Sequence, residues 1–371
     1  MAIDKVVSAS ITDSAVTDAK LSFNANQFRN LIINGDMNIS QRGTSFTGLT
    51  NGTPQYTLDR YKFSESGSMT SVYTYSQETD VPTGQGFAKS LKIQNTTAGS
   101  GHNVIETIQY IEAQNCQYLK FGTSNAESLT LSFWVKCTET GTGNIALYNL
   151  DSTRMIAKNY TISSANTWEK ITLTFPGDTS GTINNDNGAG LAVFIPIAAA
   201  GSYNTGTPGS WQAYSNGLRG AGMTIDLSNN TSDNIYITGM QLEAGTSASD
   251  FEFLPYDVNL ERCLRYYELL ASGDNQVLFN AFYYTATEIR TVYHPQVSMR
   301  ANPTLDQTSG TDYYRFIRDA ANDKFDDFTL DISSPTAVEF FNSTDMSGVQ
   351  GESGWCRTDV AASFIALDAE L

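Results

Sequence analysis

The sequence predicts an all-β protein, and three features of its composition point that way. Aromatic residues make up 11% of the chain and are mainly its 19 tyrosines and 19 phenylalanines, residue types that favour strands. Glycine, serine, threonine and asparagine, the residues of polar turns, are abundant. Hydrophobic residues make up 40%, which is enough to bury sizeable cores. With 371 residues, the chain is long enough for two domains and an extended segment.

The balance of charges excludes two classes of partner. The formal net charge is −17, from 39 acidic and 22 basic residues, so a phosphate backbone or an anionic bilayer would be repelled. No apolar run approaches the length that crosses a bilayer, and residues 1–10 lack the apolar core of a signal peptide. We therefore expect a protein that is made in a cytoplasm, binds no nucleic acid and does not insert into a membrane.

The cysteines predict buried thiols. Cys116, Cys137, Cys263 and Cys356 are far apart in the sequence and form no Cys-x-x-Cys pair. Such scattered cysteines support neither disulfides nor a zinc site.

Residues 1–27 form a leader whose apolar spacing fits no globular core. Its apolar residues recur every five positions, a period of neither a helix nor a strand: Val6, Ile11, Val16 and Leu21. Such isolated residues can be buried when short extended pieces of neighbouring chains wrap around a symmetry axis. The leader thus predicts an oligomerisation segment, and the alternative is a disordered tail.

From residue 28 to residue 256 the sequence predicts one β domain. Apolar and polar residues alternate in three runs bounded by turn residues, 128–137, 170–175 and 234–245. Residues 176–222 make a long irregular stretch that contains one strongly apolar strand, residues 191–197. Loops this long commonly carry a function or an interface.

Residues 257–273 change the apolar period to that of a helix. Asp257 is placed to cap this helix and Gly273 to end it. One face of the helix carries the apolar residues Leu260, Leu264, Tyr267 and Ala271. We expect the helix to link the first domain to a second, smaller β domain over residues 274–371, where strand-forming runs return.

An ordered set of motifs resembles a family of tailed-bacteriophage tail-fibre and virion proteins. The motifs are NLIINGDMNISQRG at 30–43, YTLDRYKF at 56–63, TLSFWVK at 130–136, NTWEKITLTFPGD at 166–178, GSWQ at 209–212, GMQLEAG at 239–245 and FEFLPYDVNLERCLRYYE at 251–268. The resemblance covers most of residues 28–268 and is most specific at its end. The leader also resembles the attachment or shaft segments of such fibres.

The resemblance implies that residues 28–256 form a carbohydrate-binding-like jelly roll, related in form to galactose-binding β-sandwiches. Residues 30–38 would be its first strand and would lie beside the last strand, near residues 237–245. Related sandwiches often hold a structural calcium ion between these segments, which makes Asp36 and Glu243 candidate oxygen ligands. The alternative is that Asp36 caps a turn and Glu243 faces solvent.

The resemblance also implies a function at the surface of a virus particle. The protein would be a receptor-binding tail fibre that contacts host surface polysaccharide, and a homotrimer attached to other virion proteins through its leader. The alternative is a structural virion protein, such as a short tail appendage, a head fibre or a capsid decoration, that uses the jelly roll for packing between copies.

Catalysis has little support in the sequence. The chain has only two histidines, His102 and His294, and it has none of the common hydrolase or phosphate-loop motifs. The regular short repeats of a parallel β-helix are also missing. We expect no enzyme, and a glycan depolymerase is the third hypothesis, because paired carboxylates could still meet in three dimensions.

Sugar binding needs an exposed aromatic face with amide or carboxylate groups around it. The long irregular stretch offers this mixture at Tyr203, Asn204, Trp211, Gln212 and Tyr214. The alternative is that Trp211 anchors the loop into the core. Trp134 and Trp168 lie in strand patterns and are predicted core residues, and Trp355 is a second candidate platform.

Overall fold

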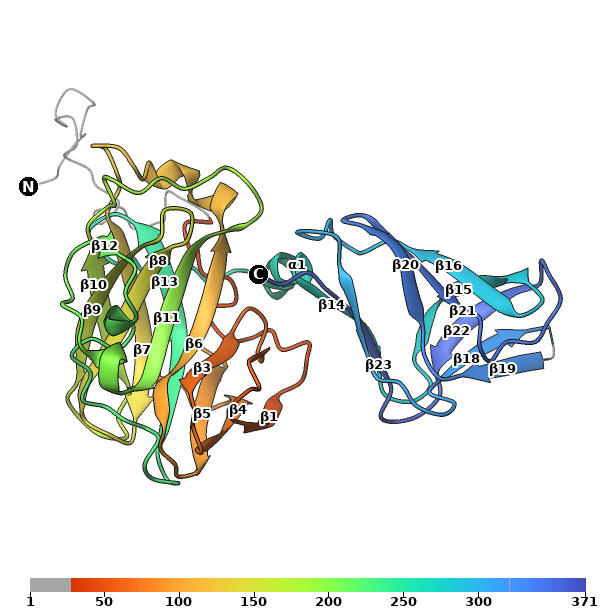
Figure 1. Ribbon diagram of the computed structural model, residues 1–371, viewed down its shortest axis with the longest axis horizontal. Coiled ribbons are helices and arrows are strands. Elements are labelled where there is room, and N and C mark those ends of the chain that lie inside the picture. The colour runs from red at the N-terminus through yellow and green to blue at the C-terminus, as the bar shows by residue number, and fades with distance from the viewer. Residues whose placement is uncertain (1–27, 320) are drawn as a thin grey trace, which may run out of the picture.

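Two β-sandwiches lie side by side along the long axis of the molecule, with helix α1 and the C-terminus between them (Figure 1). The structure is a computed structural model that describes residues 28–319 and 321–371. The predicted all-β class is confirmed. The leader residues Val6, Ile11, Val16 and Leu21, predicted to form an oligomer interface, lie outside the described residues.

The N-terminal sandwich is a jelly roll of two antiparallel sheets. The six-stranded sheet has the order β1-β4-β5-β13-β7-β10, and the seven-stranded sheet has the order β12-β9-β8-β11-β6-β3-β2. The strands are β1 (Ser45–Leu49), β2 (Gln55–Tyr56), β3 (Lys62–Gly67), β4 (Val72–Glu78), β5 (Ser90–Thr97), β6 (His102–Glu112), β7 (Leu129–Cys137), β8 (Gly141–Asn149), β9 (Arg154–Ile162), β10 (Glu169–Phe175), β11 (Ala189–Ala199), β12 (Gln212–Ala213) and β13 (Asn234–Ala244).

Alternation along each strand decides which side chains fill the core between the sheets. In β7, Phe133 and Val135 are buried in the core while Trp134 and Lys136 lie on the outer face. In β11, which the sequence predicts as a strongly apolar strand, alternate residues from Leu191 onward enter the same core. The other residue of each pair faces outward. The strands predicted from this pattern at 128–137, 170–175, 191–197 and 234–245 are therefore confirmed.

Residues 30–38 are buried beside β13 but form no strand, so the predicted first strand is wrong. The predicted neighbour is correct, because the Leu31 amide donates to the Leu242 carbonyl and the Met240 amide to the Gly35 carbonyl, both at 2.9 Å. The Asn30 side chain replaces the missing ladder: its Nδ2 donates to the Met240 carbonyl and its Oδ1 accepts from the Leu242 amide, each at 3.0 Å. The segment is thus held to β13 by two backbone bonds and by the Asn30 side chain, without a regular strand ladder.

The helix predicted over 257–273 is shorter in the structure. Helix α1 (Tyr256–Leu264) begins after Pro255, so Asp257 lies in its first turn and is not the cap. Residues 267–272 form strand β14 (Tyr267–Ser272), which pairs antiparallel with β23 (Phe364–Asp368). Pairing with a strand almost 100 positions further along the chain outweighs the local helical period.

The C-terminal sandwich also has two sheets and a core of its own. Its sheets have the orders β14-β23-β17 and β19-β18-β22-β15-β16-β21-β20. Its remaining strands are β15 (Val277–Thr285), β16 (Glu288–Tyr293), β17 (Thr304–Gln307), β18 (Tyr314–Arg318), β19 (Ala321–Phe325), β20 (Thr329–Ser334), β21 (Ala337–Asn342) and β22 (Ser353–Thr358). The core is rich in aromatic side chains, among them Tyr283, Phe316 and Phe340. All four cysteines are free and buried, as predicted.

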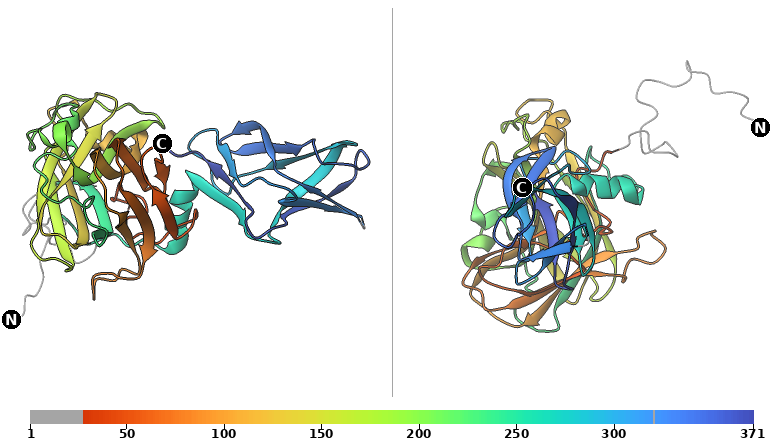
Figure 2. Two further views of the ribbon diagram at one scale, coloured as in Figure 1. Left: turned by 60° about the horizontal axis from the view of Figure 1, so that its bottom comes forward. Right: turned by 90° about the vertical axis from the view of Figure 1, so that its right-hand side faces the viewer.

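Buried ion pairs join the two sandwiches. Arg60 is only 1% exposed and pairs with Glu370 near the C-terminus. Glu112, at the end of β6, accepts from Arg265 Nε at 2.7 Å and from the Tyr266 hydroxyl at 2.5 Å. The right-hand view of Figure 2, along the long axis, shows the C-terminal sandwich in front of the N-terminal one. The linker after α1 therefore docks the second sandwich onto the first.

Candidate carbohydrate-binding face

The loop predicted to bind sugar lies on the outer face of the seven-stranded sheet of the N-terminal sandwich. Its Leu218 packs against Phe194 of β11. Tyr203 is 9% exposed, and its hydroxyl lies 3.1 Å from Ser66 Oγ. Asn204 uses both ends of its amide within the loop, where Nδ2 donates to the Met223 carbonyl and Oδ1 accepts from the Gly222 amide. These two predicted sugar ligands therefore hold the loop in place.

Trp211 and Gln212 are also tied to the protein. The Trp211 indole donates to the Pro176 carbonyl at 2.6 Å, and its ring meets the Phe121 ring edge to face at 5.6 Å. Gln212 Nε2 donates to the Thr207 carbonyl at 3.0 Å. The contacts of Trp211 are those of the alternative interpretation, in which it anchors the loop.

The fifth predicted residue, Tyr214, belongs to a row of tyrosines across the sheet. Tyr110 of β6 lies opposite Ala192 of β11, and Ala192 lies opposite Tyr148 of β8. The Tyr148 and Tyr214 ring centroids are 4.8 Å apart, with a tilt of 47°. We call Tyr110, Tyr148 and Tyr214 the tyrosine row. All three rings are half-buried on an apolar base, and the small Ala192 side chain leaves the two rings beside it standing above the sheet.

Polar groups surround the tyrosine row. The Tyr214 hydroxyl donates to Asn216 Oδ1 at 2.6 Å, and Lys62 Nζ lies 5.7 Å from the Tyr110 ring centroid. Burial raises the pKa of Tyr110 and that of Tyr214 above the usual value for tyrosine. Their hydroxyls are therefore neutral near pH 7 and can both donate and accept hydrogen bonds.

Sequence reasoning missed Tyr110 and Tyr148, although a signal for both exists. In each strand the buried core residues flank the tyrosine: Gln109 and Ile111 in β6, and Leu147 and Asn149 in β8. Alternation thus places both rings on the outer face. The two rings share one row only because of the strand order, in which β11 lies between β6 and β8.

Trp134 and Trp168 are not core residues, which corrects the prediction. Both are half-buried on the outer face of the six-stranded sheet. The Trp168 indole donates to Asp80 Oδ1 at 3.1 Å, and Lys136 Nζ lies 5.6 Å from the Trp168 ring centroid. Trp355 in β22 is 43% exposed, which keeps it available as a platform on the C-terminal sandwich.

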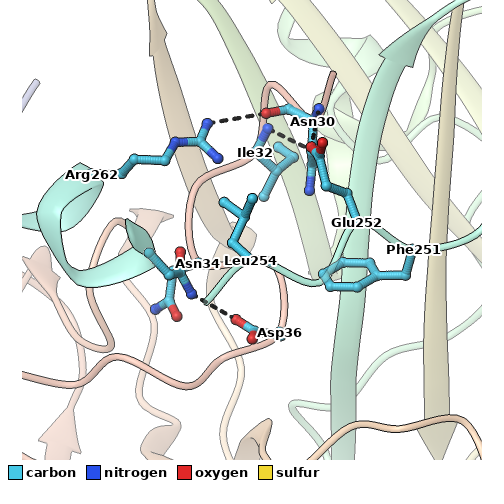
Figure 3. A pocket seen from close by; sticks show the side chains of 10 residues that line it. Asn30, Ile32, Asn34, Asp36, Phe251, Glu252, Leu254 and Arg262 are labelled. Carbon is cyan, nitrogen blue, oxygen red and sulfur yellow. Dashed lines mark hydrogen bonds between the residues drawn. The ribbon is translucent and has the colours of Figure 1, made fainter. Parts of the chain in front are cut away.

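Asp36, the first predicted calcium ligand, is 5% exposed and lies beside a polar cavity of about 10 Å³ that Glu252 and Arg262 also line (Figure 3). Its Oδ1 accepts from Asn259 Nδ2 at 3.0 Å and its Oδ2 from Asn38 Nδ2 at 2.5 Å. Burial raises the pKa of Asp36 above its usual value. The Asp36 oxygens therefore face hydrogen-bond donors, and an arginine lines the same cavity.

Glu243, the second predicted ligand, has similar surroundings. It is 5% exposed, so it does not face solvent as the alternative interpretation has it. It accepts from the Ser249 amide at 2.8 Å and from Gln241 Nε2 at 2.9 Å, and it pairs with Arg29 at 3.3 Å. A calcium ion takes six to eight oxygen ligands, whereas Asp36 accepts from two amide nitrogens, and Glu243 accepts from nitrogen donors and the Ser249 hydroxyl and pairs with Arg29. The residues around Asp36 and Glu243 therefore do not fit a calcium ion.

Within residues 28–319 and 321–371, no group of three or more histidine, cysteine, aspartate or glutamate side chains is placed to hold a metal ion. Over the same residues, no helix is long and apolar enough to cross a membrane.

Comparisons with known proteins show no family for this chain. No protein-family model matches the chain, and the search of curated proteins found no match. Among solved structures, the enzymatically active domain of bacteriophage CBA120 tailspike protein 4 is 15% identical with a TM-score of 0.31, and the match covers 54% of this chain and 21% of the tailspike chain. The family 11 carbohydrate-binding module of a Clostridium thermocellum cellulosomal cellulase is 12% identical with a TM-score of 0.28, over 54% of this chain and 98% of the module.

A third structure, the tandem family 22 carbohydrate-binding modules of a Paenibacillus barcinonensis protein, is 9% identical with a TM-score of 0.25, over 89% of this chain and 98% of that one. The chain thus spans about a fifth of the tailspike chain and nearly all of the two binding-module structures.

Proposed function

We propose that this protein is a bacteriophage tail fibre or other receptor-binding virion protein, and that it binds a host surface polysaccharide along the tyrosine row. The observation that carries the proposal is the row itself: Tyr110, Tyr148 and Tyr214 meet on one outer face of a jelly roll. The motif resemblance to phage fibre proteins supplies the biological setting.

The chemistry of the tyrosine row suits a sugar chain. One face of a pyranose ring is apolar and stacks on an aromatic ring, while its hydroxyl groups seek hydrogen bonds at the edges. The row offers neighbouring rings, neutral phenol groups and the Asn216 amide beside Tyr214. Because Tyr110 and Tyr148 come from separate strands and all three rings rest on an apolar base, the platform is pre-organised, which lowers the entropy lost on binding.

The proposal includes a homotrimer attached to other virion proteins through residues 1–27. The five-residue apolar period of Val6, Ile11, Val16 and Leu21 supports it, because a single chain cannot bury such residues alone. Native mass spectrometry of the purified protein tests the oligomeric state. A monomer or a dimer would contradict this part of the proposal.

A structural virion protein is the second candidate function, and a specific surface favours it. Exposed apolar side chains gather on the strands of the C-terminal sandwich: Phe282 (45% exposed), Tyr284 (53%), Val292 (57%), Ile332 (65%) and Trp355 (43%). Exposed apolar residues in such number are typical of surfaces that pack against other proteins. In this function the sandwiches would bind neighbouring copies in place of glycan.

We include no catalysis in the proposal. The Tyr110, Tyr148 and Tyr214 side chains carry no carboxylate, and glycoside cleavage needs two carboxylates on opposite sides of the scissile bond. Incubation of the protein with host polysaccharide, followed by size analysis of the sugar, tests this. Shortened polysaccharide chains would favour the depolymerase hypothesis.

The row is tested by replacing its central residue. Tyr148→Ala should weaken binding to host surface polysaccharide about three- to ten-fold, since one aromatic contact is worth about 0.5–1.5 kcal/mol. Tyr284→Ala, at a 53% exposed tyrosine of the other sandwich, is the matched control and should bind normally. Binding is measured on a glycan array and by adsorption to host cells, with the melting temperature recorded on each sample.

Two results would contradict the tyrosine row as the place of binding. Normal binding by a folded Tyr148→Ala variant would exclude the tyrosine row as the receptor site. Binding lost in Tyr284→Ala, with Tyr148→Ala unaffected, would move the contact surface to the C-terminal sandwich.

A further inference from the structure

A cleft of about 480 Å³ lies between the two sandwiches. Arg42 and Tyr56 line it from the N-terminal side, and Tyr267, Asp306 and Asp368 line it from the C-terminal side. Its volume falls within the range of about 300–1,000 Å³ that is typical of small-ligand sites. Arg42, Tyr56, Asp306 and Asp368 are half-buried, so their side chains stay within reach of solvent.

The cleft continues the tyrosine row. Tyr56 of β2 lies opposite Lys62 of β3, and Lys62 lies opposite Ile108 of β6, which places all three on the outer face that carries Tyr110. Lys62 Nζ is 5.4 Å from the Tyr56 ring centroid and 5.7 Å from the Tyr110 ring centroid. A ligand on the row would therefore meet Lys62 next and then Tyr56 at the cleft.

The groups in the cleft can recognise both parts of a sugar. The Arg42 guanidinium lies 3.5 Å from the Tyr267 ring centroid and 5.3 Å from that of Tyr56, so the two rings flank one cation. Asp306 accepts from the Tyr267 hydroxyl through Oδ2 at 3.2 Å. Among the described residues, its Oδ1 accepts no hydrogen bond and is available to a sugar hydroxyl. Gln55, which is exposed, adds an amide to the lining of the cleft.

The charges in the cleft select the class of sugar. Arg42 is already paired with Asp368 at 3.0 Å and with Glu370 at 3.3 Å. Glu370 also pairs with Arg60, so among the residues that line the cleft the two carboxylates of Asp306 and Asp368 outnumber the single cation, Arg42. An anionic sugar such as a uronic acid would be repelled, whereas a carboxylate accepts hydrogen bonds readily from neutral hydroxyl groups.

We propose that this cleft is a separate subsite for a neutral pyranose unit, with Tyr56 and Asp306 as its principal contacts. The inference deepens the proposed function, since the pyranose would belong to the polysaccharide bound along the tyrosine row. It makes the second sandwich part of the binding surface, so recognition depends on how the two sandwiches are docked.

Ligands of two lengths separate the subsite from the row. A neutral monosaccharide is too short to span the tyrosine row, so its binding measures the cleft. A tetrasaccharide fragment of the host polysaccharide is long enough to contact both the cleft and the row. Binding to the full chain is measured by saturation-transfer NMR and titration calorimetry. We expect Asp306→Asn, which keeps the size of the side chain, to weaken monosaccharide binding at least five-fold, and Tyr148→Ala to leave it unchanged. A hexuronic acid should bind more weakly than the matching hexose.

Gln55→Ala gives a second test at an exposed position, in case Asp306→Asn disturbs folding. It should weaken monosaccharide binding about two- to three-fold at an unchanged melting temperature. Monosaccharide binding that is absent in the wild type, or unchanged in both variants, would overturn the subsite, and so would tighter binding of the uronic acid. Monosaccharide binding could depend on Asp306 while the tetrasaccharide binds no more tightly than the monosaccharide and Tyr148→Ala leaves its affinity unchanged. In that case the subsite is supported and the proposed function is contradicted.

Discussion

Trp211 lies in the loop where the sequence most favours a sugar platform, yet its contacts are those of an anchor. Its indole N–H is bonded to the Pro176 carbonyl, which follows β10, and its ring packs on Phe121. This carbonyl supplies the hydrogen-bond partner of the indole N–H. The side chain thus joins three segments of the N-terminal sandwich.

Trp211→Ala should therefore lower the free energy of unfolding by about 2–4 kcal/mol, somewhat less than for a fully buried tryptophan. Polysaccharide affinity per folded molecule should change little. Chemical denaturation measures the first quantity and calorimetry the second. Trp355→Ala, at a 43% exposed tryptophan, should lower the free energy of unfolding by less than about 1 kcal/mol. Equal stability of the two variants would contradict the anchor role.

At the scale of elements, residues 30–38 show how a segment can close a sandwich without being a strand. Asn34 adopts a left-handed conformation with φ of 59°, and its Oδ1 accepts from the Ile39 amide at 2.9 Å. Gly35 brings its backbone against Met240 of β13, where a Cβ atom would lie 2.1 Å from the Met240 carbonyl oxygen. The tight turn around residues 34–36 is what allows this close approach.

Gly35→Ala should lower the free energy of unfolding by about 3 kcal/mol or more, because the methyl group meets backbone atoms that cannot move aside. The control is Gly52→Ala at an exposed turn, where a Cβ would meet nothing within 4 Å but φ is +77°. It should cost only about 1–2 kcal/mol for the left-handed backbone. Thermal unfolding compares the two, and a smaller effect at Gly35 would show that the segment does not pack on β13 as described.

At the scale of the whole molecule, one buried carboxylate docks the second sandwich onto the first. Glu112 has a fully buried side chain, and it accepts from Arg265 through both carboxylate oxygens, at 2.7 and 2.8 Å, and from Tyr266. Burial alone would raise the pKa of Glu112, but the hydrogen bonds from Arg265 and Tyr266 outweigh it and lower the pKa below the usual 4.5. The charged form is therefore the one that the native state stabilises.

Glu112→Gln should lower the free energy of unfolding at pH 7 by about 1–3 kcal/mol, because the buried arginine contact loses its charge. In the wild type, the charged Glu112 carboxylate stabilises the fold fully at a pH above its unfolded pKa of about 4.5. This stabilisation is lost as the pH falls through the lowered pKa of Glu112 in the folded protein. The difference between variant and wild type should therefore shrink between pH 5 and pH 3. Thermal unfolding across this pH range measures the difference in stability. A difference that stays constant would contradict a stabilising role for the Glu112 charge.

The sequence by itself determined the features that depend on neighbours along the chain. Alternation over 128–137, 170–175 and 234–245 predicted strands that the structure confirms, because successive residues of a strand must face opposite sides of its sheet. The turn at residues 34–36 and the buried state of the four cysteines are predictable for similar local reasons. Much of the fold class and the separate first sandwich could thus be predicted.

Only the tertiary structure decided the features that depend on strands far apart in the sequence. The apolar spacing of residues 267–272 is compatible with a helix and with a strand. Pairing with β23 makes this segment a strand. Tyr110, Tyr148 and Tyr214 lie in three separate segments. The register of β6, β11 and β8 brings the first two together, and the pairing of β12 with β9 brings Tyr214 beside Tyr148. Trp134 faces outward because its neighbours in β7 fill the core. The free energy of such long-range pairing is gained only when the chain has folded, so the order of strands, and with it the candidate site, is not written in any single stretch of sequence.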